Sequence, residues 1–172
     1  MAEAVKLSPQ LTRVVSHFKK YDIEVNTNKV EYTTDADVYY TDQFRKDILK
    51  NLSINSTFGN VKNLIITSGT FRYVDKDENF TDESSTIKTG YKFAVVFPSG
   101  FNHYIYLSVK GDVTGKGNIS DDDVLEAYSI LRGKKVEDYY RFASDVTNDG
   151  QIRINDIAKL YHYVNNKIES LD

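Results

Sequence analysis

The twelve-residue stretch 145–156, DVTNDGQIRIND, has carboxylates in its first, fifth and twelfth places and a glycine in its sixth. Calcium takes six to eight oxygen ligands, and a loop of this length can supply them from places 1, 3, 5, 7, 9 and 12. Glycine in the sixth place permits the positive φ of a sharp turn. The spacing predicts a calcium site rather than a plain surface turn, with these ligands: Asp145, Thr147, Asp149, the carbonyl of Gln151, and Asp156.

The stretch 112–123, DVTGKGNISDDD, is an imperfect copy of 145–156. Aligning 112–134 with 145–167 at a constant offset gives eight identical pairs, which indicates an internal duplication. The pairs are Asp112/Asp145, Val113/Val146, Thr114/Thr147, Gly117/Gly150, Ile119/Ile152, Asp123/Asp156, Tyr128/Tyr161 and Lys134/Lys167.

The first copy is the poorer calcium loop, because Lys116 stands in the fifth place and an ammonium cannot bind a cation. Its candidate ligands are Asp112, Thr114, the carbonyl of Asn118, Ser120 through water, and Asp123. Two interpretations stay open. Either Lys116 turns outward and the loop binds calcium, or its ammonium neutralises the acids and the loop stays free of metal.

Each loop is followed by apolar residues at helical spacing. They are Val124, Leu125, Tyr128 and Leu131 after the first loop, and Ile157, Leu160, Tyr161, Val164 and Ile168 after the second. Residues 136–143, VEDYYRFA, predict a third helix between the two units. The residues before the first loop, FNHYIYLSVK, alternate like a strand, whereas an ordinary EF-hand needs an entering helix there.

The first 109 residues predict an α+β module in which antiparallel strands dominate. Helical spacing favours helices near 8–18 and over 41–54, the latter capped by Thr41 with Phe44, Ile48, Leu49 and Leu52 on its apolar face. Runs rich in β-branched and aromatic residues predict strands over 21–26, 30–34, 61–74, 91–100 and 103–111.

Composition narrows the function classes. The formal net charge is −3, and all of it falls within 110–172, so a nucleic-acid partner is not expected. No apolar run is long enough to span a membrane, and the absence of Cys excludes disulfides and thiolate sites. The sequence has no G-x-S-x-G, H-E-x-x-H or P-loop motif, and its three His are scattered, so we expect no enzyme and no catalytic residues.

The paired motifs GDVTGKGNISDDDVLEAYSILRGK and SDVTNDGQIRINDIAKLYHYVNNK resemble the dockerin family. Dockerins have two calcium-binding loop–helix repeats with Asp in the last place of each loop, joined by a linker helix. The resemblance implies an α+β chain, with a β-rich domain over 1–109 that looks like an X module and a small all-α dockerin over 110–172. Family loops usually have Asn in the third place, where this chain has Thr114 and Thr147.

The resemblance also implies a function and a partner. Dockerins attach their parent proteins to cohesin domains in cellulosomes and related extracellular complexes of anaerobic bacteria that degrade polysaccharides. We therefore expect an extracellular chain, monomeric when free, that needs Ca2+ and binds a cohesin. The family positions that contact cohesin fall on Asp121, Asp122, Tyr128 and Ser129 in the first repeat, and on Ile154, Asn155, Tyr161 and His162 in the second.

Two alternatives stay beside this interpretation. One is an EF-hand-like calcium-binding protein. The other is a carbohydrate-binding β module fused to a dockerin, in which aromatic rings would stack on sugars, against the simpler interpretation that these rings form the strand core. The candidate rings are Tyr32, Tyr39, Tyr40, Phe71, Tyr73 and Tyr91.

Overall fold

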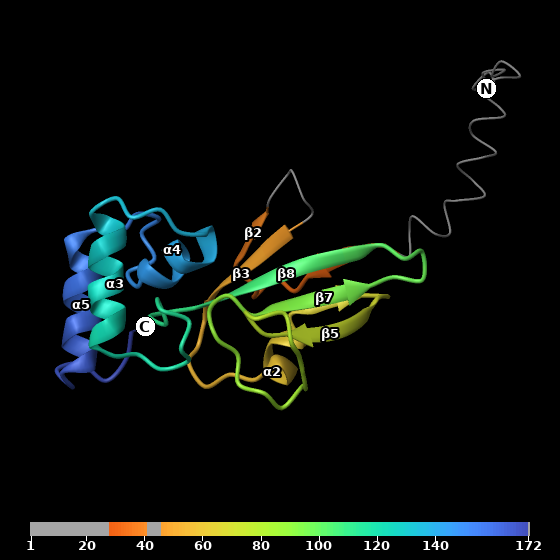
Figure 1. Cartoon of the computed structure of the whole chain (residues 1–172), viewed down its shortest axis with the longest axis horizontal. Helices are drawn as coiled ribbons and strands as arrows, with labels where there is room; N and C mark the ends of the chain where they lie inside the picture. Colours follow the sequence, from red (N-terminus) through yellow and green to blue (C-terminus); the bar gives the residue numbers. More distant parts are fainter. Residues whose placement is uncertain (1–27, 41–45, 172) are drawn as a thin grey trace, which may run out of the picture.

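A computed structural model describes residues 28–40 and 46–171 (Figure 1). The helix expected near 8–18 and the strand expected over 21–26 lie outside these residues. Eight strands are found in the described part: β1 (Val30–Tyr32), β2 (Val38–Tyr40), β3 (Lys46–Leu52), β4 (Ile65–Thr67), β5 (Thr70–Val74), β6 (Phe80–Thr81), β7 (Lys92–Val96) and β8 (Asn102–Val109). The helices found there are α2 (Phe58–Lys62), α3 (Asp121–Leu131), α4 (Asp138–Ser144) and α5 (Ile154–Val164).

Six of these strands form one sheet in the order β2-β3-β8-β7-β5-β6, and β1 pairs with β4 in a separate two-stranded sheet. Every pairing is antiparallel except that of β3 with β8. The strands predicted over 30–34, 91–100 and 103–111 are confirmed, with β8 beginning one residue earlier, at Asn102. The run 61–74 holds β4 and β5, but its first two residues belong to α2. The sequence predicts no strand at β2 or β6.

One face of the large sheet covers the main hydrophobic core. Side chains alternate between the two faces of a strand, and Ile105, Leu107 and Val109 of β8 are completely buried in this core. Helix α2 adds Phe58, whose ring meets that of Phe93 edge to face, with centroids 5.1 Å apart. These contacts fix β8, the strand that leads directly into the first candidate loop.

The opposite face of the sheet receives α4 (Figure 1). The rings of Tyr106 on β8 and Tyr139 on α4 stack with centroids 5.2 Å apart and an interplanar angle of 3°. Ser108 Oγ donates a 2.7 Å hydrogen bond to the Tyr139 carbonyl oxygen. Burial raises the pKa of Tyr139 to about 12, which reflects how much of its ring the contact removes from water.

Helices α3 and α5 lie side by side, and their apolar residues form a second cluster with the residues that flank them. Ala127, Leu160, Val113 and Val146 are buried there, and Ile119 and Ile152 pack against the cluster. The three helices lie where helical spacing and the run 136–143 predict them.

The expected fold class, an α+β chain ending in a small all-α domain, is wrong. The described chain is mostly β, with eight strands in two sheets and four short helices, and no separate all-α portion stands apart from the sheet. Two contacts join the helices to the sheet. The ring of Tyr139 on α4 stacks on the sheet, and β8 leads directly into the residues before α3. The boundary between residues 109 and 110 stays a prediction.

The helix expected over 41–54 is also wrong where the structure describes it. Residues 46–52 form β3, which lies between β2 and β8 in the large sheet. Ile48, Leu49 and Leu52 are buried. A short run of apolar residues can form either a buried strand or the apolar face of a helix, so its spacing does not distinguish the two. Thr41 and Phe44 lie outside the described residues.

Candidate functional site

Two loops with nearly the same backbone precede α3 and α5. We call residues 112–123 loop 1 and residues 145–156 loop 2; each overlaps the first turn of its helix. The fourth places, Gly115 and Asn148, have φ of 67° and 58°, and the sixth places, Gly117 and Gly150, both have φ of 84°. The duplication seen in the sequence is thus also a duplication of conformation.

In loop 1 the first and last acids are completely buried and held by hydrogen bonds. Asp112 accepts from the Gly117 amide at 3.0 Å through Oδ1, and from the Thr89 amide at 2.9 Å through Oδ2. Asp123 accepts from the amide and hydroxyl of Thr114 through Oδ1, at 2.8 and 2.9 Å. Its Oδ2 accepts from the amide and hydroxyl of Ser120, at 2.9 and 3.1 Å.

These two carboxylates are close enough to influence each other. Burial raises the pKa of Asp112, and the negative charge of Asp123 raises it further. The hydrogen bonds that Asp112 accepts from backbone amides lower its pKa but do not cancel the rise. Lys116 does not pair with them, because its ammonium lies 2.6 Å from Oδ2 of exposed Asp122. A buried pair of acids without that lysine fits a hard cation that prefers oxygen ligands, as calcium does.

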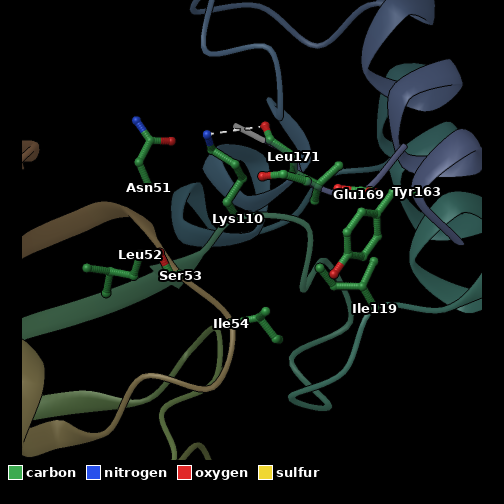
Figure 2. Close-up of a pocket in the computed structure, with 10 residues that line it drawn as sticks. Asn51, Leu52, Ser53, Ile54, Lys110, Ile119, Tyr163, Glu169 and Leu171 are labelled. Carbon is green, nitrogen blue, oxygen red and sulfur yellow. Dashed lines mark hydrogen bonds between the residues drawn. The ribbon is translucent and has the colours of Figure 1, made fainter. Parts of the chain in front are cut away.

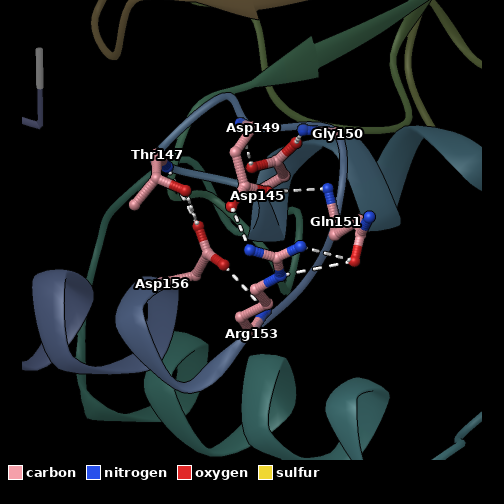
Figure 3. A network of polar contacts seen from close by, with 7 residues as sticks. All are labelled: Asp145, Thr147, Asp149, Gly150, Gln151, Arg153 and Asp156. Atoms are coloured by element: carbon pink, nitrogen blue, oxygen red, sulfur yellow. Dashed lines mark hydrogen bonds and ion pairs between the residues drawn. The ribbon is translucent and has the colours of Figure 1, made fainter.

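Loop 2 repeats the arrangement (Figure 3). Asp145 accepts from the amides of Asp149 and Gly150, at 3.1 and 2.8 Å. Asp156, completely buried, accepts from the amide and hydroxyl of Thr147 at 2.9 and 2.8 Å, and from the Arg153 amide at 2.8 Å. The first acid, the last acid and the third-place threonine are therefore positioned alike in both loops.

Arg153 is a residue of loop 2 that the sequence reasoning missed. Its guanidinium lies 3.4 Å from Oδ2 of Asp149 and donates a 2.9 Å hydrogen bond to the side-chain oxygen of Gln151 (Figure 3). The fifth-place acid thus faces an arginine four residues along, a spacing that would have signalled the contact. Both partners are substantially exposed, so water weakens the pair and a cation could displace it.

Among residues 28–40 and 46–171, no group of three or more His, Cys, Asp or Glu side chains is arranged to hold a metal. Each loop holds its first and last acids by hydrogen bonds, and its other expected ligands are hydroxyls, backbone carbonyls and, in loop 2, the carboxylate of Asp149. Asn118 and Gln151, expected to act through their carbonyls, have exposed side chains. The binding of calcium by either loop stays a prediction.

The helix residues expected to meet a partner lie at the surface. Seven of the eight are exposed, namely Asp121, Asp122, Tyr128, Ile154, Asn155, Tyr161 and His162, and Ser129 is half-buried. Ile154 is 62% exposed and Tyr161 46%, so neither belongs to the helical core. Leu125 of α3, 64% exposed, is a further apolar surface residue that helical spacing placed on the buried face.

The rings considered for sugar stacking divide into two groups. Tyr32, Phe71, Tyr73 and Tyr91 pack against the main core, as the simpler interpretation predicts. Tyr39 packs on Phe142 of α4, with ring centroids 5.0 Å apart, and Tyr40 is 64% exposed. Tyr32 donates its hydroxyl hydrogen to Asp47. The six rings therefore do not form one stacking platform.

A cavity of about 230 Å³ lies where the sheet, loop 1 and the C-terminal residues meet (Figure 2). Leu52, Ile54, Ile119 and Tyr163 contribute apolar side chains to it. Lys110 Nζ donates a 3.5 Å hydrogen bond to the Leu171 carbonyl at its edge. The cavity belongs to the junction between the sheet and the helices.

No described helix is both long enough and apolar enough to cross a membrane. In comparisons with known proteins, no family model matches the chain. No curated protein matches it either.

Proposed function

We propose that the chain is a calcium-dependent, non-enzymatic docking module that attaches its parent protein to a cohesin domain, in an extracellular complex that degrades polysaccharides. One observation carries the proposal: two duplicated loops, each with a buried pair of acids, lie at the start of two helices that expose apolar side chains. The dockerin-like motifs supply the identity of the partner.

Calcium, when bound, would neutralise the acid pairs and fix each loop through oxygen ligands. In loop 1 the protein's part is to hold Asp112 and Asp123 in place through backbone amides. In loop 2, Asp145 and Asp156 are held in the same way. Because α3 and α5 begin inside the loops, the position of each loop sets the position of the helix that follows it.

The partner surface would be formed by the exposed residues of α3 and α5. Interface centres favour aromatic and apolar anchors surrounded by polar residues. The α5 face offers Ile154 and Tyr161, whereas the equivalent positions of α3 are Asp121 and Tyr128. The two repeats therefore present different chemistry, so we propose that the partner engages them in one orientation.

The proposal is tested by calorimetric titration of the full chain with calcium, followed by titration with a candidate cohesin in calcium and in chelator. We expect calcium binding and cohesin binding that chelator abolishes. A matched control is Asp82→Asn, which removes an acid from an exposed turn of the sheet and leaves both loops intact. Cohesin binding of equal strength in chelator would refute the calcium dependence.

A further inference from the structure

The turn at residues 88–90, which connects into β7, touches loop 1 at its first ligand. Thr89 is completely buried, and its amide donates the 2.9 Å hydrogen bond to Oδ2 of Asp112. The other oxygen of Asp112 is held from within the loop, by Gly117. One of the backbone donors to this carboxylate therefore comes from the turn before β7, 23 residues earlier in the chain.

The turn is itself fixed to β8. Thr89 Oγ1 accepts a 3.0 Å hydrogen bond from the Val109 amide and lies 3.3 Å from the Val109 carbonyl oxygen, to which it donates. The Gly90 amide donates to the Leu107 carbonyl at 3.0 Å, and the Asp112 amide donates to the Val109 carbonyl at 3.1 Å. One side chain thus connects the end of the strand to the amide that holds the acid.

The turn covers loop 1 closely at two glycines: the nearest atom is backbone at Gly115, whereas at Gly117 it belongs to the flexible side chain of Lys88. A Cβ added to Gly115 would lie 2.6 Å from the Thr89 carbonyl oxygen, and one added to Gly117 would lie 2.8 Å from Cε of Lys88. The equivalent places of loop 2 are open. Asn148 occupies the fourth place there, and a Cβ on Gly150 would meet nothing within 4 Å.

A hydrogen bond between two side chains joins loop 2 to the sheet. Asn51 Nδ2 donates a 2.9 Å hydrogen bond to Oδ1 of Asn148, and this contact is exposed. Neither carboxylate of the loop-2 acid pair, Asp145 or Asp156, accepts any of its recorded hydrogen bonds from the sheet. The two loops thus differ in how far the sheet contributes to them.

We propose that the 88–90 turn is a positioning element of the loop 1 cation site, so that cation binding at loop 1 depends on the sheet and cation binding at loop 2 does not. This inference rests on the proposed calcium function. Coupling between two sites is reciprocal, so a cation in loop 1 would also hold the turn on β8. Thr89 acts through Asp112 and would not itself contact the ion.

The first experiment uses the unaltered full chain, with amide NMR during a calcium titration. The Thr89 amide should shift, and its hydrogen exchange should slow, with the same concentration dependence as the amides of loop 1. The Asn51 side-chain amide reports the loop 2 contact in the same spectra. A Thr89 amide that stays unchanged while Gly117 responds would overturn the inference.

The second experiment swaps the fourth places in two variants, Gly115→Asn and Asn148→Gly. Asn tolerates the left-handed conformation, as Asn148 shows, so Gly115→Asn mainly pushes the loop against Thr89. We expect about a tenfold weaker calcium constant at loop 1 in Gly115→Asn, a cost typical of disturbing the groups that orient metal ligands. Asn148→Gly should leave the loop 1 constant unchanged.

A second pair of variants separates the hydroxyl of Thr89 from its bulk. Thr89→Val keeps the shape of the side chain and removes both hydrogen bonds to Val109. Calcium binding at loop 1 should therefore weaken by about tenfold, as in Gly115→Asn. Thr89→Ser restores the hydroxyl and should recover most of the affinity. If the unaltered chain binds no calcium, the proposed function and the inference both fail. If it binds calcium and the loop 1 constant is the same in Gly115→Asn and Thr89→Val, the inference alone fails.

Discussion

The ammonium of Lys116 pairs with Oδ2 of Asp122 at 2.6 Å, although two buried carboxylates lie in the same loop. Both members of the pair are more than half exposed, so the contact contributes little stability. Its importance is positional, because it keeps the fifth-place lysine at the surface. Lys116 therefore turns outward in this structure, and calcium binding by loop 1 stays a prediction.

Replacing Lys116 should strengthen loop 1. Lys116→Asp adds a carboxylate in the fifth place, where loop 2 has Asp149, and should raise calcium affinity by about tenfold or more, because ligand charge tunes such loops. Lys116→Met removes the repelling charge without adding a ligand and should raise it less. Two-site calorimetric titration measures both. An unchanged constant in Lys116→Asp would contradict the assignment of this place as a ligand position.

Removal of calcium should loosen the helical part of the chain. Without a cation, Asp112 and Asp123 repel each other in loop 1, as do Asp145 and Asp156 in loop 2. Chelator should therefore lower the unfolding midpoint and speed amide exchange in 111–171 more than in β5 and β7. Differential scanning calorimetry with exchange mass spectrometry measures this, with potassium chloride at equal ionic strength as the control. Identical melting with and without chelator would exclude the prediction.

In chelator, the ionisation of Asp112 should make the free energy of unfolding depend on pH. Burial and the charge of Asp123 raise its pKa in the folded state. The folded state therefore binds the proton of Asp112 more tightly than the unfolded state does. The resulting contribution to the free energy of unfolding is fully present below the ordinary carboxyl pKa of about 3.9, and it is lost as the pH rises through the raised pKa. Asp112→Asn should flatten this part of the profile in urea unfolding. With calcium the trend should reverse, because the ligand must be ionised. A profile that Asp112→Asn leaves unaltered would contradict it.

The partner face can be tested by placing a charge at its expected centre. Ile154→Asp places a carboxylate where an apolar anchor is expected, and burying it without a partner should weaken cohesin binding by at least a hundredfold. Asp121→Ala combined with Asp122→Ala should have a smaller effect if these acids lie at the rim. Phe80→Ser is the control, since Phe80 is 70% exposed on β6, the edge strand at the other end of the sheet from β2 and β3. Loss of binding only in the Asp121/Asp122 variant would reverse the proposed orientation.

The contact between α4 and the sheet should contribute measurable stability. Tyr139→Ala removes the ring stacked on Tyr106, and we expect a loss of about 1–3 kcal/mol from lost aromatic contact and burial. Tyr128→Ala removes an exposed tyrosine of α3 and should change stability by less than about 0.5 kcal/mol. Equilibrium urea unfolding measures both. Equal losses of stability in the two variants would show that the stacking of Tyr139 on Tyr106 does not stabilise the fold.

The local sequence was enough to determine both loops and the helices that follow them. Acids, glycines and threonines at a fixed spacing define each loop, and the helical periodicity runs from residues 124 and 157 onward. These are short-range properties, because a ligand loop and its exiting helix are made from contiguous residues. In both copies the sixth-place amide donates to the first acid and the third-place amide donates to the last acid.

Tertiary structure alone decided the rest. The run that contains Ile48 and Leu49 has apolar spacing compatible with a helix, but pairing with β2 and β8 makes it a strand. The observed fold class differs from the expected one for a related reason. The ring of Tyr139 on α4 stacks on Tyr106 of the sheet and not on another helix. Thr89 gave no sequence signal as part of loop 1. Its amide reaches Asp112 because the pairing of β7 with β8 brings the 88–90 turn to loop 1. A backbone donor from a distant turn has no particular residue type, so the sequence could not reveal it.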